Sequence, residues 1–123
     1  MARKASNKNL LEEAHQAEAD GNLKAAVTLY RRALRIDPLT VAAYNRLMII
    51  YRKQKDYIKE LDIIDEAIHA LQSHEQQQQK DWIRQNRKAA SISRQLAQSL
   101  GQSWEDPVVS GWKKRAELVR TRI

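Results

Sequence analysis

The segment Asn22–Pro38, NLKAAVTLYRRALRIDP, constrains the fold more than any other part of the chain. Its apolar residues recur every three or four positions, which predicts an amphipathic helix: Leu23, Ala26, Val27, Tyr30, Ala33 and Leu34. Gly21 tolerates the left-handed backbone that closes a preceding helix, and Asn22 is a good first cap for the next one. Pro38 ends the helix because it disfavours helical backbone in the residue before it. So wide an apolar stripe must be covered by other helices.

The composition of the 123-residue chain favours helices and excludes several classes of protein. Gly occurs three times and Pro twice, so few residues interrupt a helix, and the expected fold class is all-α. Cys is absent, which excludes disulfides and thiolate metal sites and fits a reducing compartment. The polar segment MARKASNKN lacks the apolar run of a secretory signal, and no run is long enough to span a membrane. We therefore expect a cytoplasmic protein without a membrane segment.

The order of apolar and polar segments predicts three regions. Residues 1–8 form a polar N-terminal segment, and residues 9–73 contain four helices over 9–20, 22–37, 40–55 and 56–71. Residues 74–123 differ: Ser73 and Gln76 have the spacing of a capping box, and the pattern after them predicts one long helix to about Leu100. A last, basic helix begins at Asp106–Pro107 or at Ser110. Its apolar stripe consists of Trp112, Ala116, Val119 and Ile123.

The first two thirds of the chain repeat with a period of 34 residues. A shift of 34 places Leu23 on Tyr57 and Tyr30 on Ile64, and it superposes the turns 20–22 and 54–56. Two helices and one tight turn per period indicate stacked helix hairpins, which need an end cap that hides the last apolar face. The alternative is a generic four-helix array in which this register is accidental.

The repeat resembles the tetratricopeptide repeat over about residues 7–73. The residues that carry the resemblance are Ala26, Tyr30, Ala33 and Pro38 in the first unit, and Tyr44, Leu47, Tyr51 and Ala67 in the second. Glu60 departs from the pattern where the family favours Ala, and Gln72 departs from it where the family favours Pro. The resemblance implies a right-handed stack of antiparallel helix hairpins, followed here by a long helix and a capping helix.

No enzyme signature occurs in the sequence. A Gly-rich phosphate loop, an HExxH motif and a zinc-spaced cluster are all absent. His15, His69 and His74 lie on separate segments or out of phase, and the adjacent carboxylates 12–13 and 65–66 point in different directions on a helix. We therefore expect a non-catalytic protein with no cofactor and no metal.

The resemblance implies that the protein binds another protein or peptide. In this family the first helix of each hairpin lines a concave groove, and the corresponding positions here are Lys8, Leu11, His15, Glu18, Asn45, Ile49 and Arg52. Their mixture of aliphatic and basic side chains suits a peptide or partner helix with apolar anchors and some acidic character. A well-known subclass grips the terminal carboxylate of chaperone tails with Lys and Asn. The matching positions hold Leu11, His15 and Arg46, so we do not expect that activity.

Three alternatives remain for the surfaces of the chain. The predicted long helix can lie in the short groove and fill it, or its stripe of Trp82, Ala89 and Leu96 can pair with a second copy in a homodimer.

The third alternative is nucleic-acid binding. Residues 74–123 carry 10 Lys/Arg against 5 Asp/Glu, a balance of +5, whereas residues 1–73 carry 12 against 10, a balance of +2. The basic patch would be Arg84, Arg87 and Lys88, with Trp82 or Trp104 stacking on bases.

Overall fold

The computed structural model describes the backbone of residues 2–88, 91–92 and 106–123, and the side chains of these ranges from residue 8 onward. Its helices are α1 (Ala2–Ala19), α2 (Leu23–Ile36), α3 (Val41–Lys53), α4 (Tyr57–Gln85) and α6 (Pro107–Arg120). No strand occurs within these ranges. The expected all-α class is therefore confirmed.

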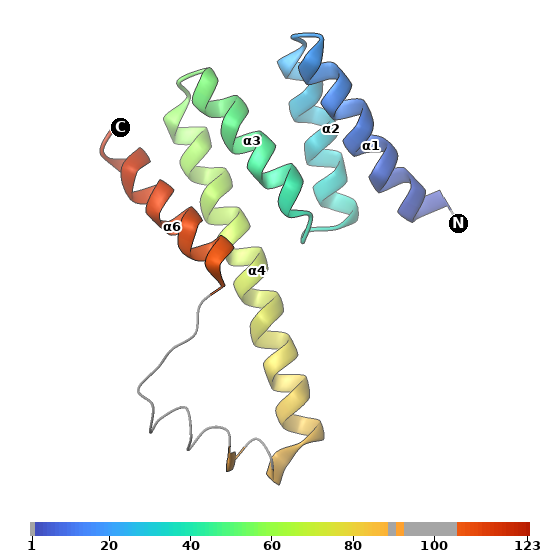
Figure 1. Ribbon diagram of the computed structural model, residues 1–123, viewed down its shortest axis with the longest axis vertical. Coiled ribbons are helices and arrows are strands. Elements are labelled where there is room, and N and C mark those ends of the chain that lie inside the picture. The colour runs from blue at the N-terminus through green and yellow to red at the C-terminus, as the bar shows by residue number, and fades with distance from the viewer. Residues whose placement is uncertain (1, 89–90, 93–105) are drawn as a thin grey trace.

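Neighbouring helices pack against each other in chain order, as Figure 1 shows. α1 packs on α2, α2 on α3, α3 on α4, and α4 on α6. The core between them is made of apolar side chains from all five helices. Its largest members with almost no exposed surface are Tyr30, Tyr44, Leu47, Ile50, Ile63, Ile64, Val109 and Val119. Burial of each such side chain contributes about 1.5–3 kcal/mol, and α6 supplies two of them, Val109 and Val119.

The α1–α2 and α3–α4 turns have the same geometry, 34 residues apart. Gly21 and Lys55 both have positive φ, at 81° and 56°. The residue after each, Asn22 or Asp56, accepts a hydrogen bond from the backbone N–H three positions later, at 3.2 Å in both turns. The backbone N–H of the same two residues donates to Ala17 and Tyr51, at 2.9 Å in both turns. The predicted turn at Gly21 and the predicted cap at Asn22 are confirmed, and the second turn repeats both.

The ends of α2 and α6 also follow local sequence signals. α2 ends at Ile36, and Asp37 before the proline is extended, with φ −139° and ψ 99°. α6 begins at Pro107, where the backbone N–H of Val108 donates to the side chain of Asp106 at 2.8 Å. Of the predicted α6 stripe, the first three residues are buried, whereas Ile123 is 64% exposed because the helix ends at Arg120.

The expected start of the first helix is wrong by seven residues. α1 begins at Ala2, whereas the sequence pattern predicts a polar segment before a helix at Asn9. Residues 2–8, ARKASNK, contain neither Gly nor Pro, so nothing in them stops the helix from extending toward the N-terminus.

The two helices expected on either side of Ser73 form one helix. α4 continues from Tyr57 to Gln85, because the segment around Ser73 contains no Gly or Pro and a capping-box spacing does not by itself interrupt a helix. The expected extension to about Leu100 is also wrong. α4 stops where Asn86 donates hydrogen bonds from its backbone and its side chain to the carbonyl of Trp82. Residues 87–88 and 91–92 are helical again, and residues 93–105 lie outside the described part.

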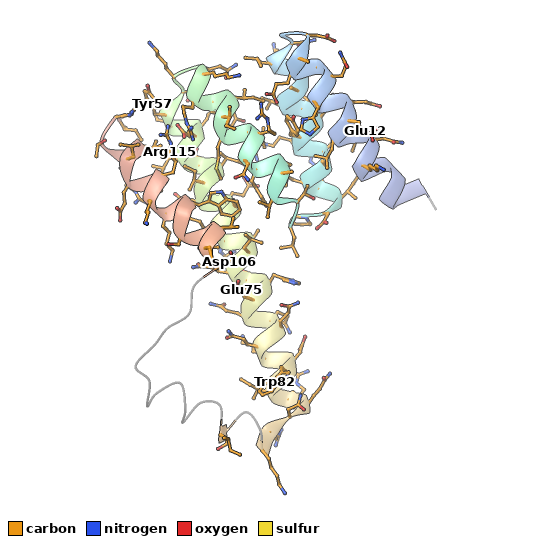
Figure 2. All side chains as sticks on the ribbon, viewed as in Figure 1. Glu12, Tyr57, Glu75, Trp82, Asp106 and Arg115 are labelled. Atoms are coloured by element: carbon orange, nitrogen blue, oxygen red, sulfur yellow. The ribbon has the colours of Figure 1, made fainter. Side chains whose placement is uncertain are left out.

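The second half of α4 projects from the other helices (Figure 1). Its residues from Ser73 to Gln85 are exposed, except for the partly buried Glu75 and Ile83. Trp82, labelled in Figure 2, lies on this projection, and its exposed fraction is 45%. None of the described helices is long and apolar enough to cross a membrane.

Candidate interaction surface

Four of the predicted groove residues lie on one side of α1. Lys8 and His15 are exposed, whereas Leu11 and Glu18 are partly buried. Leu11 packs against the core, so only part of this aliphatic side chain is open to a partner. The side of α1 that carries these residues therefore presents a positive charge and an imidazole beside a small apolar surface.

A hydrogen-bonded network fixes the C-terminal half of this side of α1. The buried Tyr30 hydroxyl donates to Glu18 Oε1 at 3.0 Å and lies 2.8 Å from His15 Nδ1. Because the hydroxyl has one proton and gives it to Glu18, the Nδ1 of His15 donates to the hydroxyl oxygen. The imidazole also packs edge-on against the Tyr30 ring, at 5.6 Å between centroids. Burial raises the pKa of Tyr30, which keeps this donor protonated.

Glu18 connects α1 to α3. Arg46 donates to Glu18 Oε1 from Nε at 3.1 Å, and its Nη2 donates to the other carboxylate oxygen. The Glu18 side chain is only 10% exposed, so this two-point pair is largely shielded from water. The sequence pattern predicts that Glu18 contacts a partner directly. In the structure its charge is paired with Arg46, and this pair links α1 to α3.

The remaining predicted groove residues, Asn45, Ile49 and Arg52, lie on the outward side of α3. Asn45 and Arg52 are exposed, and Ile49 is partly buried but lies outside the core. Asn45 accepts a hydrogen bond from the Trp112 indole Nε1 at 2.9 Å, and the Trp112 ring packs edge-on against Tyr44. α6 therefore fixes the orientation of a side chain on the candidate surface.

A buried carboxylate lies next to Arg52. Glu60 on α4 is fully buried, and it accepts hydrogen bonds from Arg115 Nε at 2.8 Å and Arg115 Nη2 at 3.2 Å. Arg52 Nε donates to the same carboxylate at 3.3 Å. Burial of a charge is costly unless it is paired, and here two guanidinium groups, from α3 and α6, provide the pairing. The sequence pattern does not predict this cluster, although a Glu on an apolar stripe is a signal for it.

The seven predicted groove residues are divided between α1 and α3, and the Glu18–Arg46 pair bridges these two helices. The alternative in which the long helix fills the groove concerns residues after Ser73. The described part of that segment in α4 projects away from α1 and α3 and does not cover them (Figure 1). Residues 89–90 and 93–105 are not described, so this alternative is tested only for the residues before them.

The predicted basic patch is exposed but is not on one helix. Arg84, Arg87 and Lys88 are all exposed, as nucleic-acid binding requires. The three do not belong to one continuous helix, because α4 ends at Gln85, between Arg84 and Arg87. Of the predicted dimer stripe, Trp82 is exposed, and Ala89 and Leu96 lie outside the described residues.

Two further features of the described surface concern metal ligands and a surface hollow. No group of three or more His, Cys, Asp or Glu side chains in residues 8–88 and 106–123 is arranged to hold a metal ion. A hollow of about 510 Å³ lies between the α3–α4 turn and the C-terminal residues. Its lining consists of Gln54, Lys55, Asp56, Tyr57, Ile58, Arg122 and Ile123, and none of these is a predicted groove residue.

Comparison with known proteins finds no matching family model, no matching curated protein and no matching solved structure.

Proposed function

We propose that this protein is a non-catalytic protein–protein interaction module. In this proposal the two hairpins are tetratricopeptide-like repeats, α6 caps their stack, and the outward sides of α1 and α3 bind a peptide or a partner helix. The partner has apolar anchors and acidic residues, because Leu11 and Ile49 are partly exposed between the basic side chains of Lys8 and Arg52.

The repeated turn geometry is the observation that carries this proposal. Gly21 and Lys55 occupy corresponding positions with positive φ, and the caps that follow them have equal hydrogen-bond lengths. A second hairpin that repeats the first brings α3 into the position of α1, so that equivalent sides of both helices face outward. The Glu18–Arg46 pair supports this arrangement because it bridges α1 and α3 directly.

Selection from a peptide library tests the proposal, because it requires no identified partner. The full chain would be immobilised and used to select from short random peptides that are displayed internally in a carrier protein. We expect enriched peptides that contain aliphatic and acidic residues. Ile49→Asp should abolish their binding, because it places a negative charge at the centre of the proposed surface.

Ile58→Asp is the matched control. Ile58 is 62% exposed on α4 and is not part of the proposed surface, so this variant introduces the same charge and should bind the peptides as the unaltered chain does. Equal loss of binding in both variants, or no enriched peptide, would contradict the proposal.

A second candidate function is nucleic-acid binding by the projecting end of α4. It is favoured by the exposure of Trp82, Lys80 and Arg84 on the projecting end of α4. Exposed aromatic rings and exposed cations are the groups that bind single strands, by stacking and by phosphate neutralisation. Binding of a single-stranded oligonucleotide at low salt, lost on Arg84→Ala together with Arg87→Ala and Lys88→Ala, would support this function. Failure to bind at low salt would exclude it.

A further inference from the structure

Asn45 presents two hydrogen-bond donors in a fixed orientation. Its Oδ1 accepts from the Trp112 Nε1 at 2.9 Å, so the carbonyl side of the amide is already used. In the described part of the chain the Asn45 NH₂ group donates no hydrogen bond, and the residue is exposed. Trp112 is buried and cannot rotate freely, so it holds the Asn45 donors in place for an external acceptor.

Arg52 carries a positive charge that Glu60 does not neutralise. Arg115 contacts both oxygens of the Glu60 carboxylate, and one guanidinium balances one carboxylate. Arg52 adds a second guanidinium, so the cluster has a net charge of +1. The Arg52 side chain is 42% exposed, and its Nε bond to Glu60 fixes its direction. Neither of its Nη groups donates a hydrogen bond to another described residue.

Ile49 lies between these two donor groups. Asn45, Ile49 and Arg52 are spaced by four and three positions, which places them on one side of α3. The helix rises about 1.5 Å per residue, so the first and last of the three are about 10 Å apart along its axis. A single carboxylate cannot contact two groups at that distance. The surface therefore fits two different acceptors on either side of an aliphatic contact.

We infer that this side of α3 binds an internal acidic segment of a partner protein, in which an Asp or Glu side chain pairs with the Nη groups of Arg52. An aliphatic side chain of the segment packs on Ile49, and a backbone carbonyl accepts from the Asn45 NH₂ group. An extended chain advances about 3.3 Å per residue, so the aliphatic residue lies one or two positions from the acidic one. This inference rests on the proposed function, and it names the chemistry of the partner.

The charge and the spacing both favour a side-chain carboxylate in the interior of a partner chain. A terminal carboxylate is captured where several donors converge on one point, whereas the donors here are separated along the helix. A polyanion such as a nucleic acid needs a row of cations, and of the three side chains only Arg52 is charged.

Fluorescence anisotropy with one of the selected peptides tests the inference. The peptide would be synthesised with both ends blocked, and it would be compared with a copy in which Glu is replaced by Gln. We expect Arg52→Gln to raise Kd about tenfold to a hundredfold, because a charge-assisted pair is lost. The Gln peptide should bind the unaltered protein just as weakly, and Arg52→Gln should weaken it no further. Asn45→Ala should raise Kd by a smaller factor, about threefold to tenfold.

Arg32→Gln is the matched control, because Arg32 is exposed on α2 and its replacement removes the same charge from another surface. It should leave Kd unchanged, and thermal denaturation of every variant should show an intact fold. Peptides that bind through Ile49 but tolerate Arg52→Gln would overturn this inference and leave the proposed function standing. Failure to select any peptide would overturn both. Tight binding of a single-stranded oligonucleotide that Arg52→Gln abolishes would assign the surface to nucleic acid and overturn the inference.

Discussion

The two halves of α4 form one continuous helix, yet different forces stabilise them. The first half buries Glu60, Ile63, Ile64 and Ala67 against α3 and α6. The second half, from Ser73, projects alone and keeps most of its side chains in water. Helical propensity and local hydrogen bonds therefore stabilise the second half, whereas tertiary packing stabilises the first. The two candidate functions belong to different parts of the molecule. The proposed peptide-binding surface lies on the packed body, which consists of α1, α2, α3, the first half of α4 and α6. The candidate nucleic-acid surface lies on the projection.

The largest difference between the halves is expected for truncation of an apolar side chain. Ile64→Ala should lower the free energy of unfolding by about 2–5 kcal/mol, because Ile64 is fully buried and the change leaves a cavity. Trp82→Ala removes a larger side chain from the projection. It should cost less than about 1 kcal/mol, because Trp82 is already 45% exposed. Urea unfolding of the two variants measures this contrast, and equal losses would show that the projection is packed.

Removal of the buried charge is expected to have the next largest effect. Glu60→Gln leaves Arg52 and Arg115 without their carboxylate. It should cost about 2 kcal/mol, less than the 3–5 kcal/mol of a fully buried pair, because both guanidinium groups reach water. The same change at Glu66, which pairs with Arg31 at 2.9 Å on the surface, is the control and should cost less than about 1 kcal/mol. A Glu60 variant as stable as the Glu66 variant would contradict the role of this cluster in fixing α6.

A proline in the projection should change helix content without changing the stability of the body. Gln78→Pro removes a helical hydrogen bond and costs about 3 kcal/mol within an isolated helix. Because Gln78 is exposed, that cost should unfold only the second half of α4. Circular dichroism should show a smaller helical signal, while the melting temperature should stay within about 1–2 °C of the original value. A large fall in the melting temperature would show that the two halves unfold together.

Local signals in the sequence predict the two helix hairpins. They do not predict contacts between residues that are far apart along the chain. The turn at Gly21 and the cap at Asn22 depend only on near neighbours, and both are confirmed. The turn at residues 54–56 is also confirmed, and it repeats this geometry with Lys55 and Asp56. The capping-box spacing at Ser73 wrongly predicts the start of a new helix, because the same spacing also occurs inside a continuous helix. No Gly or Pro interrupts α4 near Ser73, so the helix continues.

The sequence predicts which side of each helix carries the candidate surface. It does not predict which contacts the residues of that surface make. Its residues follow from the repeat register. The bond from Trp112 to Asn45 spans 67 positions and the bond from Arg115 to Glu60 spans 55. Pairings at such separations have no local pattern, and only the polar residue on the α4 stripe indicates that Glu60 needs partners.

The smallest expected effect concerns alkaline pH. Burial raises the pKa of Tyr30 and of Tyr44 above the ordinary value of about 10. The folded state thus holds these protons more tightly than the unfolded state. Their contribution to stability is complete below pH about 10 and is lost as the pH rises through the raised values. Ultraviolet titration of phenolate should show a late phase that Tyr30→Phe reduces, and full ionisation near pH 10 in the folded protein would contradict the burial.

Mapping of the peptide contacts by NMR tests the central claim most directly. Backbone amide shifts of the full chain would be recorded while a selected, end-blocked peptide is added. If the packed body carries the function, the shifts should change along α3 between Asn45 and Arg52 and on the side of α1 between Lys8 and Glu18. Changes confined to residues 80–88 of the projection, with none on α3, would contradict the account.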